Sequence, residues 1–426
     1  MLFLYTILIT CLAIVLSPIL VCMAVFNQRG MKHRLGLQPL IPENNTRPVV
    51  WFHAASMGEV VGMAMVVHRF VHAYPEYQIF VTTLTATGLE YARQHIPETR
   101  DCHLLPLDVP FIVKRFFKRL RPVALILLEG ELWPSLLAGA DRYGCPSVLI
   151  NARMSDRSYP RNQYVKPLFR AILRRLTVIG TQSPLDAERY IEFGAEPNQV
   201  VVTGNVKFDQ ATASSLPDRG TVRKMLGLSD DDLVIMAGCP RPVSEEDAVL
   251  QACKVVHDRY PDCKIIWAPR HLERIPDVEN RLTEAGLPYL LRSRLDHQIS
   301  MAATVLILDT MGELATLYAA ADMAFVGATI VPLGGHNVLE PAACGIPVLF
   351  GPHTENVRAS AEALLRSGGG RVVQNGDELA EAWMMLIAQP DRRKEMGAAA
   401  KEAVHAGNGA LDRTMALLEE RLFGDR

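Results

Sequence analysis

Along most of the chain, segments with two different patterns of apolar and polar residues alternate. From residue 49 onward, short apolar runs alternate with longer stretches in which apolar residues recur every three or four positions. This alternation is typical of βα units. Because Val, Ile and Leu fill the short runs almost without interruption, we expect parallel sheets covered by helices on both faces. The runs predicted to be strands are, in the first half, Val49–Ala54, Ile79–Thr83, His103–Leu107, Val123–Glu129, Ser147–Asn151, Val178–Gln182 and Val200–Gly204, and in the second half, Leu233–Gly238, Lys264–Pro269, Tyr289–Leu291, Val305–Asp309, Met323–Gly327, Val348–Gly351 and Val372–Val373.

The predicted strands form two groups, separated by the segment Gln210–Gly220. This segment is rich in Ala, Thr, Ser, Pro and Asp and carries no strand pattern, so it is interpreted as a linker. We therefore predict an α/β protein with two Rossmann-like, doubly wound domains that face a cleft, over residues 29–212 and 213–408. In residues 409–426, an apolar stripe over Leu411–Phe423 indicates a last helix, which we expect to return to the first domain.

Residues 1–28 have a different pattern. No charged side chain occurs from Leu2 to Phe26, and a helix over this run would be roughly 37 Å long, enough to cross a hydrocarbon layer of about 30 Å. Basic residues follow from Arg29 onward, which favours a single-pass membrane anchor with the rest of the chain in the cytoplasm. A cleaved signal peptide would need a basic residue before the apolar run, and none is present. A hairpin kinked at Pro18 that lies in the membrane surface remains an alternative.

The composition of the chain argues against several classes of protein. The chain has 426 residues, with 44 Lys and Arg against 46 Asp and Glu, and this balance argues against a basic nucleic-acid-binding protein. Apolar residues make up 49% and charged residues 21%, which excludes wholesale disorder. The 8 cysteines include no C-x-x-C pair. We therefore expect free thiols in a reducing compartment, with neither a zinc ribbon nor a disulfide framework.

Three candidate groups in the first half follow predicted strands, where ligands of open α/β sheets bind. Ser56 is a helix cap, and Glu59 falls in the first helical turn, where the helix dipole is expected to keep it ionised. A carboxylate that only stabilises the helix fits the same position. Glu129 and Glu131 follow a buried strand, and they either orient a cation or lie in a solvated loop. Lys207 follows the last strand of the first group.

The second half offers candidate phosphate-binding groups. Arg270 follows a strong strand, and its planar guanidinium suits a phosphate. Asp309–Leu314 ends another strand and is predicted to open a helix whose N–H groups face an anion. Within Gly327–Ala343, paired glycines would let the backbone approach a phosphate, and Glu340 would accept hydrogen bonds from a ribose.

Two other phosphate-binding classes lose support. Neither a P-loop motif nor G-x-G-x-x-G is present, which disfavours ATPases of that class and NAD-dependent dehydrogenases. The acidic run Asp230–Asp232 precedes a strand, so we interpret it as a solvated loop and a poor candidate for the D-x-D metal site of metal-dependent glycosyltransferases.

Taken in order, the motifs resemble the 3-deoxy-D-manno-octulosonic acid (Kdo) transferase family over essentially the whole chain. The resemblance implies a GT-B fold and an inverting, metal-independent transfer of Kdo from CMP-Kdo to the lipid A precursor, lipid IVA, in lipopolysaccharide core biosynthesis, releasing CMP. It further implies no cofactor and a place at the cytoplasmic face of the Gram-negative inner membrane. The segments that carry it are His53–Glu59, Glu129–Pro134, Asn151–Arg153, Gly204–Asp209, Pro269–His271, Asp309–Leu314, Gly334–Ala342 and Gly351–Thr354.

By this resemblance, Glu59 is the proton acceptor, and Glu129 and Lys207 stabilise the transition state. The positions that match the family's CMP-contacting segments are Pro269, Arg270, Met311, Gly312, Glu313, Asn337, Val338, Leu339 and Glu340. The chain departs from the family at Gly238–Pro242, where many relatives have a Ser/Thr-rich loop, and at Ala328 and Thr329, where they have Gly and Ser. These departures leave the donor contacts open.

Two functions other than Kdo transfer fit part of the same pattern. Another GT-B transferase would use a different nucleotide sugar on a lipid-linked acceptor. A non-catalytic, membrane-anchored protein that binds sugar nucleotides would keep the nucleotide loops and lack the base, yet Glu59 is present.

Overall fold

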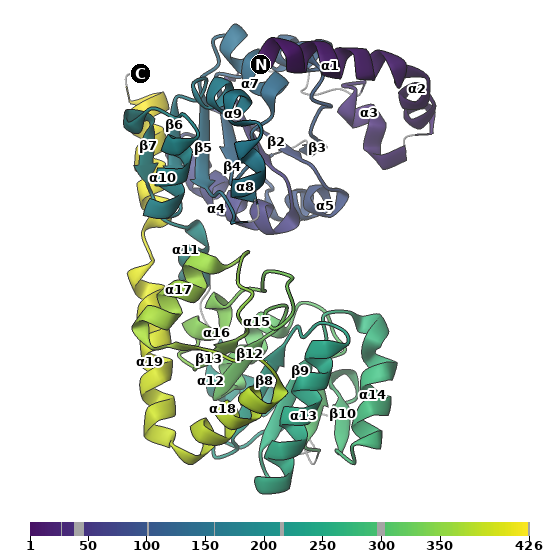
Figure 1. Cartoon of the computed structure of the whole chain (residues 1–426), viewed down its shortest axis with the longest axis vertical. Coiled ribbons are helices and arrows are strands. Elements are labelled where there is room, and N and C mark those ends of the chain that lie inside the picture. Colours follow the sequence, from purple (N-terminus) through teal and green to yellow (C-terminus); the bar gives the residue numbers. More distant parts are fainter. Residues whose placement is uncertain are drawn as a thin grey trace. The chain divides into compact units, whose positions relative to one another are not determined.

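The computed structural model describes residues 1–26, 28–37, 47–99, 102–156, 158–213, 217–295 and 303–424. The chain forms two compact units. The first consists of residues 1–210 together with 409–426, and the second of residues 211–408. Each unit contains one parallel, seven-stranded sheet with helices packed against it (Figure 1).

The first sheet has the strand order β3-β2-β1-β4-β5-β6-β7. Its strands are β1 (Val49–Ala54), β2 (Gln78–Thr83), β3 (Cys102–Leu104), β4 (Ala124–Leu128), β5 (Ser147–Ala152), β6 (Val178–Thr181) and β7 (Val200–Val202). The helices of this unit are α1 (Leu2–Val15), α2 (Ser17–Val25), α3 (Met31–Arg34), α4 (Met57–Ala73), α5 (Ala86–His95), α6 (Pro110–Leu120), α7 (Pro134–Arg142), α8 (Ser158–Gln163), α9 (Lys166–Leu173), α10 (Pro184–Glu192) and α20 (Ala410–Leu418). Helix α11 (Val206–Ala213) continues into the second unit.

The second sheet has the order β10-β11-β9-β8-β12-β13-β14. Its strands are β8 (Val234–Gly238), β9 (Lys264–Ala268), β10 (Tyr289–Leu291), β11 (Val305–Ile307), β12 (Met323–Val326), β13 (Val348–Phe350) and β14 (Gly370–Val372). The helices are α12 (Arg219–Met225), α13 (Ser244–Arg259), α14 (Ile275–Glu284), α15 (Leu314–Leu317), α16 (Leu339–Ala343), α17 (Arg358–Ser367), α18 (Gly376–Ala388) and α19 (Pro390–Ala406).

Each sheet is buried on both faces, as the apolar runs predicted. Side chains alternate between the two faces of a strand. In β1, Trp51 belongs to one apolar core while Val50 and Phe52 belong to the other. In β8, Ile235 and Met236 are divided between two cores in the same way. All the runs predicted to be strands are confirmed, although several end sooner. Strand β4 stops at Leu128 because Glu129 turns the backbone into the left-handed region, with φ of 55°.

The predicted linker Gln210–Gly220 is largely helical where the structure describes it. Helix α11 continues to Ala213, and α12 begins after Asp218, whose carboxylate accepts the N–H of Thr221 at 2.8 Å. This is an ordinary cap at a helix start. Residues 214–216 lie outside the described part of the chain.

The predicted single anchor helix is broken into two. Helices α1 and α2 meet at a 60° bend, and no single helix among the described residues is long and apolar enough to cross a membrane, although the bent pair passes that test by length and composition. Pro18, at the start of α2, explains the break, because a proline ring removes one backbone donor and collides with the preceding helical turn.

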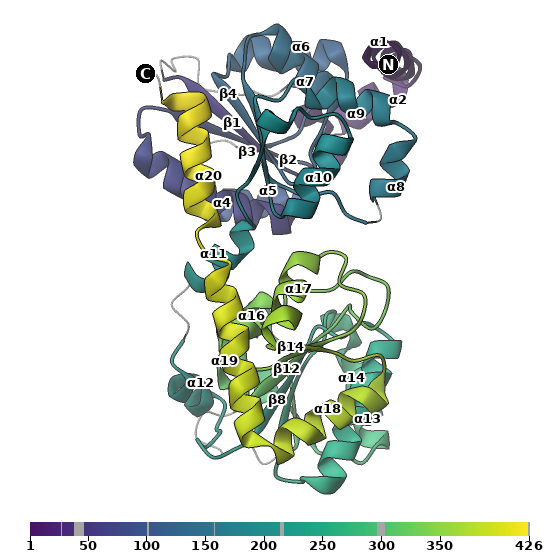
Figure 2. The same ribbon diagram turned by 60° about the vertical axis from the view of Figure 1, so that its left-hand side comes forward.

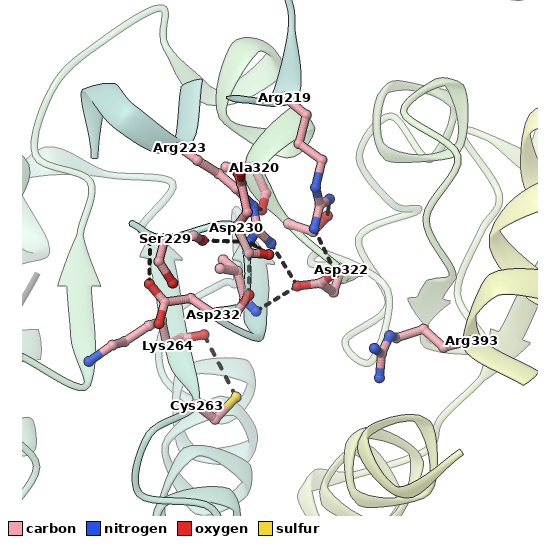
Figure 3. Close-up of polar contacts among 12 residues, drawn as sticks. Arg219, Arg223, Ser229, Asp230, Asp232, Cys263, Lys264, Ala320, Asp322 and Arg393 are labelled. Carbon is pink, nitrogen blue, oxygen red and sulfur yellow. Dashed lines mark hydrogen bonds and ion pairs between the residues drawn. The ribbon is translucent and has the colours of Figure 1, made fainter. Parts of the chain in front are cut away.

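A buried arginine holds the amino end of the strands in the second unit. Arg223 of α12 is fully buried, and Figure 3 shows its guanidinium surrounded by carbonyl and carboxylate oxygens. It donates to the carbonyls of Ser229, Asp230 and Asp232 at 2.9 Å, and its Nη2 lies 2.9 Å from Asp322. The acidic run Asp230–Asp232 therefore precedes β8 and lies at the amino end of the strands, where its carbonyl groups bind Arg223 and stabilise the fold.

The last helix packs within the first unit. Helix α20 lies beside α4 (Figure 2), and Phe423 packs against the rings of Phe70, Tyr74 and Tyr77. The carboxylate of Asp209 accepts the N–H groups of Gly409 at 2.7 Å and Leu411 at 3.1 Å. These two bonds satisfy backbone donors at the start of α20, which otherwise would have no partner within the helix.

Candidate active site

The candidate residues of the first unit gather where its strand order reverses. Strands β1 and β4 are neighbours at this reversal, and crevices of this kind are the usual ligand sites of doubly wound sheets. Glu59 lies in the first turn after β1, and Glu129 directly follows β4. Two acidic groups that are 70 residues apart in sequence are therefore brought to the same crevice.

Glu59 is held by the start of its own helix. Its Oε2 accepts the N–H of Ala55 at 2.8 Å, and its Oε1 accepts the hydroxyl of Ser56 at 3.0 Å. Burial raises the pKa of Glu59 to about 7, and the negative charges of Glu129 and Glu131 act in the same direction. The expectation that the helix dipole keeps this group fully ionised is therefore wrong. Desolvation and two like charges outweigh the dipole and the hydrogen bonds.

Glu129 forms an ion pair with Lys207. The Nζ of Lys207 lies 3.0 Å from Oε1 of Glu129, and the two side chains are 30% and 12% exposed. Lys207 reaches this place because Asn151 and Asn205 fix the start of α11: their side chains accept the N–H groups of Val206 at 3.2 Å and Lys207 at 3.0 Å. The ion pair places one cation next to the acidic crevice.

Glu131 is tied to the wall of the crevice. Its Oε2 accepts the indole N–H of Trp133 at 2.7 Å and lies 3.1 Å from Nε2 of His53, whose ring is fully buried. The other nitrogen of His53 lies 2.9 Å from the carbonyl oxygen of Thr82. The site thus holds three carboxylates. Lys207 pairs with that of Glu129, and the imidazole of His53 lies beside that of Glu131.

The second sheet reverses its order between β8 and β12, and the candidate donor-binding groups follow these strands and their neighbours. Pro269 is buried at the end of β9, and Arg270 after it is exposed. The charge of Arg270 reaches His336 in the glycine-rich segment, where it contributes to lowering the pKa of that histidine. An exposed guanidinium is therefore available at this edge of the sheet.

Asn337 and Glu340 form one hydrogen-bonded unit. Asn337 accepts the N–H of Leu339 at 3.0 Å through Oδ1 and donates to Glu340 at 3.0 Å through Nδ2. Burial raises the pKa of Glu340, and the bond from Asn337 opposes that rise. Val338 and Leu339 are buried, so their side chains belong to the core. Glu340 is the group of this segment that retains oxygen atoms suited to hydroxyl donors.

The segment after β11 is arranged differently from the prediction. Helix α15 is a single turn that begins at Leu314, so an extended helix with several free N–H groups is not formed. Glu313 lies 3.0 Å from Arg292 and accepts the hydroxyl of Thr310. Met311 is 76% exposed, and Gly312 has φ of 85°, which favours glycine. The exposed Met311 is the apolar surface that this loop presents.

Several backbone donors of the glycine-rich segment, which was predicted to cradle a phosphate, have partners within the protein. The N–H groups of Ala328, Thr329 and Ile330 donate to the buried carboxylate of Glu245 at 2.6–2.8 Å. The space above Gly334 is filled as well, because an added Cβ would meet Asn356 at 2.4 Å. Helix α16 has only five residues, and the N–H of Leu339 is bound to Asn337. An internal carboxylate therefore occupies the anion-binding position of this loop.

Groups suited to metal binding were sought throughout the described ranges. Within those ranges, no cluster of three or more His, Cys, Asp or Glu side chains is arranged to hold a metal ion.

Comparison with known proteins decides the family. The profile described as "3-Deoxy-D-manno-octulosonic-acid transferase (kdotransferase)" matches residues 29–210, and one described as "Glycosyl transferase-like" matches residues 309–419. A curated 3-deoxy-D-manno-octulosonic acid transferase of Chlamydia pneumoniae is 31% identical over 97% of this chain and 95% of its own length. The chain belongs to the Kdo transferase family. The corresponding transferase of Haemophilus influenzae is 32% identical over 88% of this chain and 87% of its own length.

Solved structures show that the transferase has a GT-B-type fold. A UDP-GlcNAc 2-epimerase from Neisseria meningitidis has a TM-score of 0.63, with 13% identity, and covers 87% of this chain and 100% of its own. A glycosyltransferase from Rickettsia africae has a TM-score of 0.58, with 11% identity, over 89% of this chain and 99% of its own. At these identities the likeness concerns the fold alone.

Two residues of these sites have no role in the sequence-based prediction, His53 and Glu245. His53 lies within a motif that the sequence singled out, whereas Glu131 was predicted with Glu129 to orient a cation. Glu245 stands in the run Ser244–Asp247, which has the acidic composition of any helix start. Its partners in the glycine-rich segment are more than 80 residues further along the chain, so no local pattern identifies it.

Proposed function

We propose that this transferase moves Kdo from CMP-Kdo to the lipid A precursor, lipid IVA, in lipopolysaccharide biosynthesis, with inversion at the anomeric carbon and release of CMP. The observation that carries the proposal is the half-buried carboxylate of Glu59 beside the Glu129–Lys207 pair, in the crevice where the first sheet reverses its order. A carboxylate whose pKa is close to the working pH is suited to general base catalysis.

In the proposed reaction, Glu59 accepts the proton of a sugar hydroxyl of the acceptor. The oxygen then forms a bond to the anomeric carbon of Kdo on the face opposite the phosphate, and the bond from that carbon to the phosphate oxygen breaks. The electron pair leaves with CMP. Glu129 faces the positive charge that develops on the sugar, and Lys207 supplies a cation for the acidic donor. Because the pKa of Glu59 is about 7, the rate is expected to rise as the pH increases through neutrality.

The second unit is proposed to bind the nucleotide. The exposed guanidinium of Arg270 is suited to a phosphate, and Glu340 to the hydroxyls of a ribose. The charge of Arg270 is suited to stabilise the anionic leaving group, so we propose that no divalent metal is required. EDTA is therefore expected to leave the transfer rate unchanged. Loss of activity that a divalent cation restores would contradict this part of the proposal.

The deciding experiment is the variant Glu59→Ala. We expect transfer to fall by at least 100-fold, the lower range for a lost general base, while the Kd for CMP changes less than 2-fold because the nucleotide groups lie in the second unit. Transfer is measured with CMP-Kdo and lipid IVA, and CMP binding by calorimetry with UDP as the comparison. Unchanged turnover would remove Glu59 from the mechanism, and tighter binding of UDP than CMP would favour another nucleotide sugar.

We also propose that residues 1–26 hold the enzyme on the cytoplasmic face of the inner membrane, where the acceptor lies. Tyr5, Ile9 and Ala13 form the inner stripe of α1: Ile9 and Ala13 join an apolar core of the first unit, and the Tyr5 hydroxyl donates to Asp108 at 2.7 Å. Phe3, Leu8 and other apolar side chains on the remaining faces are exposed. Because α1 is attached to the first unit in this way, we propose that α1 and α2 lie along the bilayer surface and do not form a straight span across it.

A further inference from the structure

The loop after β8 occupies the reversal point of the second sheet. β8 pairs with β9 on one side and with β12 on the other, where Gly238 lies opposite Ala268 and Val326 (Figure 1). The loop that begins at Cys239 therefore lies between the loop that carries Arg270 and the glycine-rich segment. The packing there is close, since a Cβ added to Gly327 would meet the carbonyl oxygen of Cys239 at 2.3 Å. Ligands of doubly wound sheets bind in this crevice.

Arg241 in this loop keeps a donor available for a ligand. Its Nη1 lies 2.9 Å from Nε2 of His271, and because arginine only donates, that nitrogen is the acceptor. The proton of His271 is then on Nδ1, which lies 3.3 Å from Glu273. The Nε of Arg241 is buried and has no hydrogen-bond partner among the described residues. A buried N–H without a partner is unfavourable unless a ligand or a water molecule accepts a hydrogen bond from it.

A second guanidinium group and a histidine from two neighbouring loops lie near Arg241. Burial is the main cause that lowers the pKa of His336 to about 4, and the charges of Arg270 and Arg241 lower it further. His336 is therefore neutral, and its Nε2 is also buried without a partner. Two guanidinium groups and an imidazole with an open hydrogen-bonding position thus face the same region, which favours an anion there.

Glu245 fixes this arrangement without neutralising the Arg241 side chain. It is fully buried, and its carboxylate accepts the backbone N–H of Arg241 at 2.8 Å as well as those of Ala328, Thr329 and Ile330. Its charge is thus directed at main-chain donors from two loops. The same carboxylate sets the distance between the Arg241 loop and the glycine-rich segment.

We propose that Arg241 binds an anionic group of the donor, and that Glu245 is the positioning residue that presents it. The ligand chemistry is a phosphate or a sugar carboxylate, and this inference rests on the proposed CMP-sugar function. It assigns a ligand to the loop Gly238–Pro242, whose donor contacts the sequence leaves open.

The first experiment compares the wild type with Arg241→Ala, using cytidine, CMP and CMP-Kdo as ligands in calorimetry. A lost charge-assisted hydrogen bond is expected to weaken the affected ligand by about 10–100-fold. Weaker binding of both CMP and CMP-Kdo identifies the phosphate, and weaker binding of CMP-Kdo alone identifies the carboxylate. Unchanged binding of both, or an equal loss for cytidine, would overturn the inference.

Two further variants control this experiment. Arg241→Lys retains the charge but not the planar fork, so it is expected to recover part of the affinity. Arg366→Ala removes an arginine whose side chain is 73% exposed on α17, and it is expected to bind all three ligands as the wild type does. If the wild type itself does not bind CMP, the proposed donor is wrong; if it binds both CMP and CMP-Kdo independently of Arg241, only the present inference fails.

The second experiment tests Glu245 as a positioning residue. Glu245→Gln is expected to raise the KM for the donor at least 5-fold with little change in kcat, and the loss is expected to be non-additive with Arg241→Ala. Glu246→Gln is the matched control, because Glu246 is equally buried but pairs with Arg274 and Arg281. Additive losses, or an equal rise in KM for both glutamine variants, would show that Glu245 acts only through stability.

Discussion

Glu59 and Glu245 occupy corresponding places in the two units. Each lies in the first helical turn after the strand at which the sheet order reverses. Glu59 has one backbone donor and one hydroxyl as partners, and its pKa is raised to about 7. Glu245 is fully buried and has backbone donors from two loops. The same residue type at the same position therefore serves as a candidate base in one unit and as an internal anion in the other.

The raised pKa of Glu59 predicts a pH-dependent stability. Between pH 4.5 and about 7 the folded state binds more protons than the unfolded state, so this group destabilises the wild type as the pH rises. Glu59→Gln does not titrate, so we expect it to exceed the wild type in free energy of unfolding at pH 8, by about 1–3 kcal/mol, and to match it below pH 4.5.

Urea unfolding at pH 4.5 and pH 8 measures this difference. Glu188→Gln, which changes an exposed carboxylate in the same unit, is the control and is expected to show no pH-dependent difference. An equal effect of Glu59→Gln at both pH values would contradict the raised pKa.

For single residues, the sequence predicts a position at the site where that position depends only on the neighbouring sequence. Glu59 and Arg270 come shortly after long apolar strands, so their place near the strand ends is predictable. The environment that raises the pKa of Glu59 is not, because it depends on Glu129 and Glu131 from another strand. Thr329 is a similar case: its buried hydroxyl accepts the N–H of Gly351 at 2.7 Å, a partner that local pattern does not reveal.

Among the elements, buried parallel strands were the most predictable, because burial on both faces demands continuous Val, Ile and Leu. Short helices were the least predictable. Helices α15 and α16 are one turn each, since side chains such as Asn337 bind the nearby backbone in place of further helical bonds. The loops after the strands are therefore where sequence and structure differ most.

Helix α12 depends on Arg223 for its attachment to the second sheet. Arg223→Met has a similar volume but leaves the carboxylate of Asp322 and the carbonyls around it without this donor. We expect a loss of about 3–5 kcal/mol in the free energy of unfolding, measured by urea denaturation.

Arg219→Met is the matched control, because Arg219 pairs with the same Asp322 at 2.7 Å but is 44% exposed. Its loss is expected to be about 1 kcal/mol or less. Similar losses for both variants would show that burial of the Arg223 guanidinium is not what matters.

At the scale of the whole molecule, the division into two α/β sheets followed from the grouping of strands. The bend in the N-terminal segment was only an alternative, because the uncharged apolar run from Leu2 to Phe26 favours a straight helix. The bend is accompanied by contacts of α1 with α7 and α9, which are long-range contacts that a hydropathy pattern does not contain.

The exposed apolar face of the N-terminal segment predicts membrane binding. Leu8 and Val15 are 70% and 73% exposed, and each side chain buried in a lipid phase contributes about 1.5–3 kcal/mol. The double variant Leu8→Asp, Val15→Asp is expected to bind anionic phospholipid vesicles at least 100-fold more weakly in a sedimentation assay. Leu185→Asp, on α10 of the same unit, is the control. Retention of wild-type binding by the double variant would contradict the proposed membrane contact.

The return of the chain to the first unit has a consequence for synthesis on the ribosome. The first unit lacks α20 until residues 211–408 have been translated, a delay of roughly 10–40 s at about 5–20 residues per second. During that interval the rings of Phe70, Tyr74 and Tyr77 lack the cover of Phe423. The nascent chain therefore exposes an aromatic patch until α20 has been made, and the unit whose synthesis begins first is completed last.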